Sequence, residues 1–366
     1  MNHPEIDDIL IHEDHFTADM KTQAEPYLAA RRKELTLFRE EGHPIHCVRY
    51  SPNGLFGAAQ APCAESSAQG SAEGPARDSL RGGSASAPSA CTAVRGVIVM
   101  SHGFTETTEK YRELICYFLR CGFAVSIHDH CGHGRSYRLS EDASRVHIDT
   151  WERYRDDLLC AAHAARDEYP SLPLYLFGHS MGGGIAAAAA AAEPSLFAKV
   201  ILSSPMIRPT SGGVPWFATR FICAFFCAIG REQSYAPGQG PYRPGERFED
   251  SAASSEPRFQ YYKELRDADP ALRMGGATYG WMNASVKLST FLLKEGWQAI
   301  SCPVLLLQAD HDDFVMNAQQ GEFMEKLRGV SASSRLVHLS GTKHELFNSR
   351  DDILAEYLAL LLDFLN

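Results

Sequence analysis

The sequence contains a Gly-x-Ser-x-Gly pentapeptide that runs from Gly178 to Gly182 and has Ser180 at its centre. It follows an apolar run at residues 172–177 and precedes an alanine-rich stretch that predicts a helix. A serine on a sharp strand-to-helix turn exposes its hydroxyl, and small neighbours permit that turn. No nucleotide-binding glycine motif occurs at this turn. We therefore predict that Ser180 is a catalytic nucleophile; the alternative is a glycine-rich turn with a bystander serine.

A serine nucleophile needs a base, and the base needs an acid that orients it. In hydrolases that carry this type of turn, the acid and then the histidine follow the serine in the chain. His344 lies in the loop after the last predicted strand and is our predicted base, whereas His338 falls inside that strand. The acid follows the preceding strand, and periodicity does not separate Asp310, Asp312 and Asp313.

Acyl transfer also requires hydrogen-bond donors for the oxyanion of the tetrahedral intermediate. The backbone N–H of Met181, directly after the predicted nucleophile, is the first candidate. The second candidate is the N–H of Phe104, in the loop that follows an apolar run ending in Met-Ser-His-Gly-Phe. A plain turn at residues 102–103 is the alternative interpretation.

Residues 128–134, His-Asp-His-Cys-Gly-His-Gly, contain side chains that can ligate zinc. Alternation along a strand places His128 and His130 on one face, and the remaining residues are typical of a glycine-rich loop. We therefore expect a structural loop after a strand here, and we predict no metal ion.

The elements that must position these residues alternate between apolar runs and helical patterns. Such alternation predicts an α/β protein with a doubly wound, mostly parallel sheet. Helices are expected near residues 25–39, 109–120, 150–168 and 351–365. Strands are expected at residues 43–50, 94–101, 123–129, 172–177, 199–204, 303–309 and 335–339.

Two segments interrupt this alternation within what we predict to be a single domain, residues 1–366. Between residues 54 and 93, 27 of 40 residues are Ala, Gly, Ser or Pro, which predicts a disordered low-complexity insertion. Residues 205–300 are rich in aromatic residues, Gly and Pro, and lie between two predicted strands. We interpret them as a helical cap or lid.

An apolar stretch at residues 214–229 within this cap is too short to span a bilayer, which takes about 20 residues. A helix that is apolar on almost all sides is buried, lines a ligand pocket or faces a membrane. We expect it to bind an acyl chain and to make weak, hydrophobic membrane contact; ordinary core packing is the alternative. Its candidate substrate-binding residues are Trp216, Phe217, Phe221 and Phe225.

The 366 residues include 35 Lys or Arg and 45 Asp or Glu, a formal net charge of −10. An acidic chain without a basic cluster is a poor nucleic-acid binder. Ten cysteines without a Cys-x-x-Cys pair indicate a reducing compartment, and the acidic start of the chain does not resemble a signal peptide. We therefore expect a cytoplasmic protein that is at most peripheral at the inner face of the membrane.

With these residues placed, the chain resembles the monoacylglycerol-lipase-like α/β-hydrolases, and among them it is most similar to bacterial lysophospholipases of the membrane-associated type. The resemblance runs from about residue 95 to the end of the chain. It is carried by SHGF-x-E-x-x-x-x-Y, DHCGHGRS, GHSMGG, LLLQADHDDFV, SGTKHELFN and the cap sequence RMGGATYGW at residues 273–281.

The resemblance implies an α/β-hydrolase fold and a serine esterase that needs no cofactor. It favours Asp312 as the acid of a Ser180–His344–Asp312 triad, acting through an acyl-enzyme on the single acyl ester of a lysophospholipid. A monoacylglycerol lipase, a broad carboxylesterase and an acyltransferase are alternatives, and a catalytically dead binding protein is a further one. The chain departs from the family in its insertion and at Asp313, where a basic residue is common.

Overall fold

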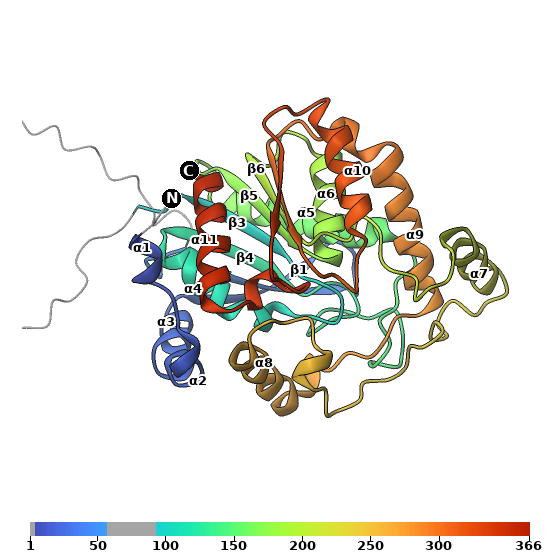
Figure 1. Cartoon of the computed structure of the whole chain (residues 1–366), viewed down its shortest axis with the longest axis horizontal. Helices are drawn as coiled ribbons and strands as arrows, with labels where there is room; N and C mark the ends of the chain where they lie inside the picture. Colours follow the sequence, from blue (N-terminus) through green and yellow to red (C-terminus); the bar gives the residue numbers. More distant parts are fainter. Residues whose placement is uncertain (1–3, 57–92) are drawn as a thin grey trace, which may run out of the picture.

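The computed structural model describes residues 4–56 and 93–366, which form an eight-stranded sheet with helices on both faces (Figure 1). The strand order is β1-β2-β4-β3-β5-β6-β7-β8, and neighbours run parallel from β4 to β8. Strands β1 and β2 pair antiparallel. The strands are β1 (Arg32–Phe38), β2 (Pro44–Tyr50), β3 (Gly96–Ser101), β4 (Phe123–His128), β5 (Leu174–His179), β6 (Lys199–Ser203), β7 (Val304–Ala309) and β8 (Arg335–Leu339).

The central strand β3 is buried on both faces, which explains its uninterrupted apolar sequence. Val97 and Val99 belong to the core on one face, and Ile98 and Met100 belong to the core on the other. The first face packs against α5 (Trp151–Glu168), α6 (Met181–Ala192), α9 (Tyr279–Lys294) and α10 (Asn317–Arg328). The second face packs against α4 (Arg112–Arg120), α11 (Asp351–Leu365) and the N-terminal helices α1 (Pro4–Asp7), α2 (Phe16–Asp19) and α3 (Glu25–Ala29).

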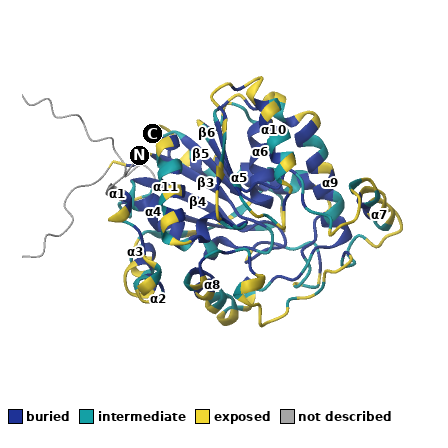
Figure 2. Ribbon diagram, in the orientation of Figure 1, coloured by how far each residue is buried: buried dark blue, intermediate teal, exposed yellow. Residues whose placement is uncertain are grey.

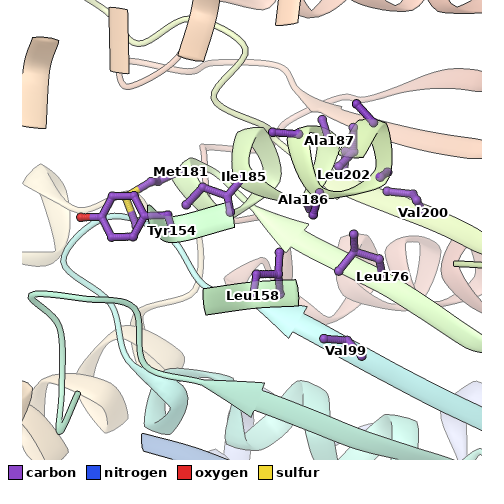
Figure 3. Packing of buried hydrophobic residues seen from close by; sticks show 14 of the residues in the cluster. Val99, Tyr154, Leu158, Leu176, Met181, Ile185, Ala186, Ala187, Val200 and Leu202 are labelled. Atoms are coloured by element: carbon purple, nitrogen blue, oxygen red, sulfur yellow. The ribbon is translucent and has the colours of Figure 1, made fainter. Parts of the chain in front are cut away.

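Helix α6 lies especially close to the sheet because its sequence is almost entirely glycine and alanine. Figure 3 shows Ile185 and Ala186 of this helix beside Leu176 of β5 and Val200 of β6, all of which are fully buried. Leu158 of α5 enters the same cluster. Because α6 begins directly after Ser180, this packing fixes the turn that carries the predicted nucleophile.

The expected helix at residues 25–39 is wrong in its second half. Helix α3 ends at Ala29, and the chain continues as strand β1. The residues of β1 are ordinary helix formers, but their side chains alternate in burial and pair in register with β2, from Arg32 opposite Tyr50 to Phe38 opposite Pro44. Pairing with a neighbouring strand therefore overrides local helix propensity here. Most of the predicted insertion at residues 54–93 lies outside the described residues.

The segment between β6 and β7 contains α7 (Trp216–Ala228), α8 (Glu256–Ala268) and α9. Of these, α9 contributes Leu288 and Leu292 to the main core, so it is part of the body of the protein. Helix α7 projects away from the rest of the molecule and is exposed along most of its length, as Figures 1 and 2 show. The cap predicted at residues 205–300 thus consists of helices with very different packing.

Helix α8 is attached to the body through the N-terminal segment and α11. The guanidinium group of Arg258 is buried, donates to a carboxylate oxygen of Glu113 at 3.1 Å and to the carbonyl oxygen of Ile11 at 2.8 Å, and lies 3.0 Å from Asp351. Asp351 also accepts a hydrogen bond from the backbone N–H of Glu13 at 3.0 Å. Residues from the beginning, the middle and the end of the chain therefore meet around one arginine.

Candidate active site

The turn between β5 and α6 holds Ser180 in a backbone conformation that few residues adopt, with φ 53° and ψ −121°. The surrounding glycines are required sterically. A Cβ atom on Gly182 would lie 2.1 Å from the carbonyl oxygen of Ser101, and one on Gly178 would lie 2.5 Å from the carbonyl oxygen of Gly182. The glycines of the pentapeptide therefore allow α6 to approach β3, and the strained serine is held by that close packing.

The structure brings Ser180, His344 and Asp312 together in one hydrogen-bonded chain. His344 Nε2 is 2.7 Å from Ser180 Oγ, and His344 Nδ1 is 2.7 Å from Asp312 Oδ2. The other carboxylate oxygen of Asp312 accepts from the backbone N–H groups of Phe314 and Val315 at 2.9 and 3.0 Å. Burial opposes the ionisation of Asp312, but the hydrogen bond and the charge of His344 outweigh it and lower the pKa of Asp312. Such a chain can move a proton from the serine hydroxyl to the imidazole.

The other two acidic candidates take different places. Asp310 accepts a hydrogen bond from the N–H of Gly341 at 3.0 Å and lies 3.3 Å from His338 Nε2. Asp313 is exposed. Neither is hydrogen-bonded to His344, whereas Asp312 is.

Phe104 and Met181 both contact the indole of Trp281, a residue of α9. The ring of Phe104 is 4.4 Å from that of Trp281, and the indole N–H donates to the sulfur of Met181 at 3.4 Å. The loop that carries Phe104 is fixed by a hydrogen bond, because the N–H of Gly103 donates to the buried carboxylate of Glu106 at 2.7 Å. The two candidate oxyanion donors therefore belong to backbone that is fixed by side chains.

A cavity of about 270 Å³ opens beside Ser180 and His344. This volume is at the small end of the range for ligand pockets. Part of its lining is apolar and comes from the loop after β6, from α9 and from the loop after β7: Met206, Pro209, Trp281, Met282, Phe314 and Val315. Another part is charged: Glu106, Lys110, Glu246, Lys263, Arg266 and Glu345.

The four aromatic residues predicted to bind an acyl chain do not line this cavity; they are Trp216, Phe217, Phe221 and Phe225. The last three are 68%, 76% and 59% exposed. Helix α7 turns its Thr219 and Cys223 inward, and the ring of its Phe226 stacks on Tyr279 of α9 at 4.1 Å. Because α7 is apolar on nearly all sides, its sequence gave no indication of which side would face outward.

The sequence analysis did not identify helix α8 as part of the site. Four of its residues line the cavity, namely Phe259, Tyr262, Lys263 and Arg266. Their spacing of three, four and seven residues places them on one side of a helix. This spacing is the only feature of the sequence by which they could have been grouped. It resembles an ordinary amphipathic pattern, so only the tertiary structure reveals what this side of α8 faces.

Beneath the site, Lys110 is buried between two carboxylates. Its Nζ atom is 2.9 Å from a carboxylate oxygen of Glu106 and also bonds Glu345. Burial alone would lower the pKa of Lys110, but the two carboxylates raise it above the ordinary lysine value. This lysine is therefore charged and fully engaged within the protein.

The histidine-rich segment at residues 128–134 forms part of a buried cluster of histidine rings. The rings of His102 and His130 are 4.5 Å apart, and those of His128 and His130 are 4.7 Å apart. The backbone N–H of His130 donates to His102 Nε2 at 2.9 Å. Burial lowers the pKa of His128 and of His133 to about 3. Within residues 4–56 and 93–366, no three His, Cys, Asp or Glu side chains are arranged to hold a metal ion.

Comparisons with known proteins agree with this architecture. The family described as serine aminopeptidase S33 matches residues 92–351. The chain is 30% identical to lysophospholipase L2 of Escherichia coli K12 over 275 residues, which is 74% of this chain and 80% of that protein. It is 29% identical to the monoacylglycerol lipase of Mycolicibacterium smegmatis over 267 residues, or 72% of this chain and 86% of that one.

Among solved structures, a thermostable carboxyl esterase from Bacillus coagulans in complex with glycerol superposes with a TM-score of 0.66. The comparison covers 92% of this chain and 99% of the esterase at 19% sequence identity, so it supports the fold alone. The sheet order, the strained serine turn and the match over residues 92–351 lead to one conclusion. The chain belongs to the serine aminopeptidase S33 family and has the α/β-hydrolase fold.

Proposed function

We propose that this protein hydrolyses the acyl ester of lysophospholipids with Ser180 as nucleophile, His344 as base and Asp312 as the acid that orients the base. The observation that carries the proposal is the hydrogen-bonded chain of these three residues at a cavity with both apolar and charged walls. The family membership and the names of the similar proteins support ester hydrolysis of single-chain lipids.

The proposed reaction has two steps. Ser180 Oγ attacks the ester carbonyl while its proton passes to His344 Nε2, and the N–H groups of Phe104 and Met181 stabilise the oxyanion. His344 then protonates the leaving alcohol, which departs from the acyl-enzyme. Water attacks the acyl-enzyme with His344 again as base, which releases the fatty acid and restores the serine.

Hydrolysis of monoacylglycerols is the second candidate, because the similar mycobacterial protein is named a monoacylglycerol lipase. The test is a panel of substrates with the same palmitoyl chain: a lysophospholipid, a monoacylglycerol, and the corresponding amide and thioester. Highest kcat/KM on the lysophospholipid supports the proposal. Highest kcat/KM on the monoacylglycerol supports the second candidate, and turnover of none of them contradicts both.

We further propose that the exposed side of α7 contacts the surface of the membrane in which these substrates lie. Phe217, Phe221 and Phe225 are spaced by four residues and form one exposed aromatic row. An apolar helical face of this kind inserts shallowly at the boundary between headgroups and acyl chains. No helix within the described ranges, 4–56 and 93–366, is long and apolar enough to cross a bilayer.

The membrane contact is tested by sedimentation with phosphatidylcholine vesicles. Replacing the three phenylalanines by serine is expected to weaken vesicle binding by about 1000-fold or more, since three buried Phe side chains at about 1.5 kcal/mol each together contribute about 4.5 kcal/mol. Hydrolysis of a dissolved short-chain ester should not change, because the row lies outside the cavity. Equal vesicle binding by wild type and variant would contradict the proposal.

A further inference from the structure

Helix α8 forms one wall of the cavity that holds Ser180, and this wall combines rings with positive charges. Phe259 and Tyr262 are nearly buried, and Lys263 and Arg266 extend from the same side of the helix. The lining contributed by α9 and by the loop after β7 is apolar and includes Trp281 and Phe314. A ligand that fills this cavity therefore meets apolar side chains and, on α8, two cations that are each paired with a carboxylate.

The two cations on α8 have more hydrogen-bond donors than their partners within the protein use. Arg266 bonds Glu246 through Nη2, whereas its Nε–H is buried and has no acceptor in the part of the chain that the structure describes. Lys263 donates to Asp267 at 2.7 Å, and an ammonium group has three donors. Glu246 and Asp267 are 37% and 41% exposed, so water can take over their hydrogen bonds when another anion arrives.

The third cation of the cavity is not available in this way. Lys110 is enclosed by Glu106 and Glu345, and its side chain is 9% exposed. Lys263 and Arg266 are thus the cations that can accept an anion entering from solvent. Phosphate suits such a pair, because the planar guanidinium binds two of its oxygens and the ammonium group binds a third.

We propose that Lys263 and Arg266 bind the phosphate of a lysophospholipid headgroup and so make the enzyme select lysophospholipids over monoacylglycerols. The inference rests on the proposed function, since it specifies the headgroup end of that same site. It assigns the selection of the headgroup to α8, away from the three residues that carry out the chemistry.

The decisive experiment compares palmitoyl lysophosphatidylglycerol with palmitoylglycerol, which differ only in the phosphate-bearing headgroup. The variant Lys263→Met with Arg266→Gln removes both charges and keeps most of the side-chain volume. Its kcat/KM on the lysophospholipid is expected to fall about 10- to 100-fold, as for lost hydrogen bonds to charged groups, with the change mainly in KM. Its kcat/KM on palmitoylglycerol should stay at the wild-type value.

A matched control is Lys287→Met, which removes an exposed lysine from α9 outside this cavity. This control should leave kcat/KM on both substrates unchanged. The variant Lys263→Met with Arg266→Lys should keep more of the preference for the lysophospholipid than Lys263→Met with Arg266→Gln. An equal fall on both substrates, or no fall on either, would overturn the inference.

A binding measurement separates this inference from the proposed function. Calorimetry on Ser180→Ala detects headgroup binding without turnover, with a short-chain lysophospholipid and the matching monoacylglycerol as ligands. Tighter binding of the lysophospholipid, lost in the Lys263→Met, Arg266→Gln background, is the expected result even if wild-type turnover fails on the substrate panel. Equal affinity for the two lipids would overturn the inference. Inorganic phosphate should compete only weakly, and competition as strong as that of the lipid would make this a site for free phosphate instead.

Discussion

The turn that carries Ser180 and the exposed helix α7 differ in how strongly their packing restricts the sequence. Around Ser180 every neighbour is buried, and added atoms at Gly182 would collide with backbone 2.1 Å away. Along α7, the large side chains of Phe217, Phe221 and Phe225 are exposed. The first region is specified by sterics and tolerates little change, whereas the second is free to vary without disturbing the fold. The proposed chemistry and the proposed membrane contact thus belong to regions with different structural constraints.

The largest effect, on kcat, is expected for a substitution in the tightly packed turn that carries Ser180. Ser180→Ala should lower kcat on a dissolved ester by about 10⁶-fold, as in other serine hydrolases, while the melting temperature stays near that of wild type. Labelling by a fluorophosphonate should disappear. Wild-type labelling of the variant would place the nucleophile elsewhere.

The acid loop gives a sharper test, since two aspartates two residues apart have different partners. Asp312→Asn should lower kcat by about 10⁴-fold, because an amide beside His344 favours the wrong tautomer. Asp310→Asn should retain near wild-type activity, as Asp310 bonds Gly341 and His338 instead. The reverse order of activities would refute the assignment.

The steric argument can be tested directly with glycine substitutions. Gly182→Ala should reduce the free energy of unfolding by about 3 kcal/mol, since its Cβ would overlap backbone that cannot move away. Gly240→Ala, which has no atom within 4 Å of the added Cβ, should change it by less than about 0.5 kcal/mol. Urea denaturation of both variants provides the measurement, and similar values would show that the turn is not tightly packed.

The buried histidines predict how stability depends on pH. The pKa of His128 is lowered by burial from 6.5 to about 3, so the unfolded chain binds its proton first as pH falls. Its contribution to stability is complete above pH 6.5 and is lost progressively toward pH 3.

His128→Phe should therefore flatten the dependence of unfolding free energy on pH between 6 and 4, by about 1.4 kcal/mol per pH unit. Denaturation at a series of pH values measures this slope. His311→Gln is the matched control, because the side chain of His311 is 84% exposed and its replacement should not change the slope. An unchanged slope in His128→Phe would contradict the prediction.

The smallest effect is expected on α7. Phe221→Ala should change the free energy of unfolding by less than about 0.5 kcal/mol, because the ring is 76% exposed. The same change at Phe177, which is fully buried in β5, should cost about 3–5 kcal/mol. Thermal denaturation of the two variants measures these losses of stability. Similar losses for Phe221→Ala and Phe177→Ala would contradict the comparison.

The sequence predicted those parts of the fold in which the local residue pattern directly reflects burial or backbone geometry. Strand β3 reads as an apolar run because both of its faces are buried, and the Gly-rich turn at Ser180 follows directly from backbone sterics. The sequence does not distinguish the three aspartates, because their difference lies in tertiary contacts: Asp312 accepts from the N–H groups of Phe314 and Val315 and lies beside His344.

Other features escaped prediction for different physical reasons. Strand β1 is composed of helix formers and becomes a strand through pairing with β2. Helix α7 has no polar side that would indicate its orientation, and the cavity-facing side of α8 looks like any amphipathic helix. In each case the outcome depends on neighbours that are distant in the sequence.

The meeting of distant segments around Arg258 has a consequence for how the protein matures on the ribosome. The N–H of Glu13 pairs with a carboxylate that lies 338 residues later, and at about 5–20 residues per second this partner is synthesised about 20–70 s afterwards. Ile11 and Phe16, which are almost fully buried in the finished protein, also depend on later residues, since the N–H of Ile11 donates to the hydroxyl of Tyr117 and the ring of Phe16 lies 5.8 Å from that of Tyr261. The contacts of the N-terminal segment with Asp351 therefore form only after α11 has been synthesised.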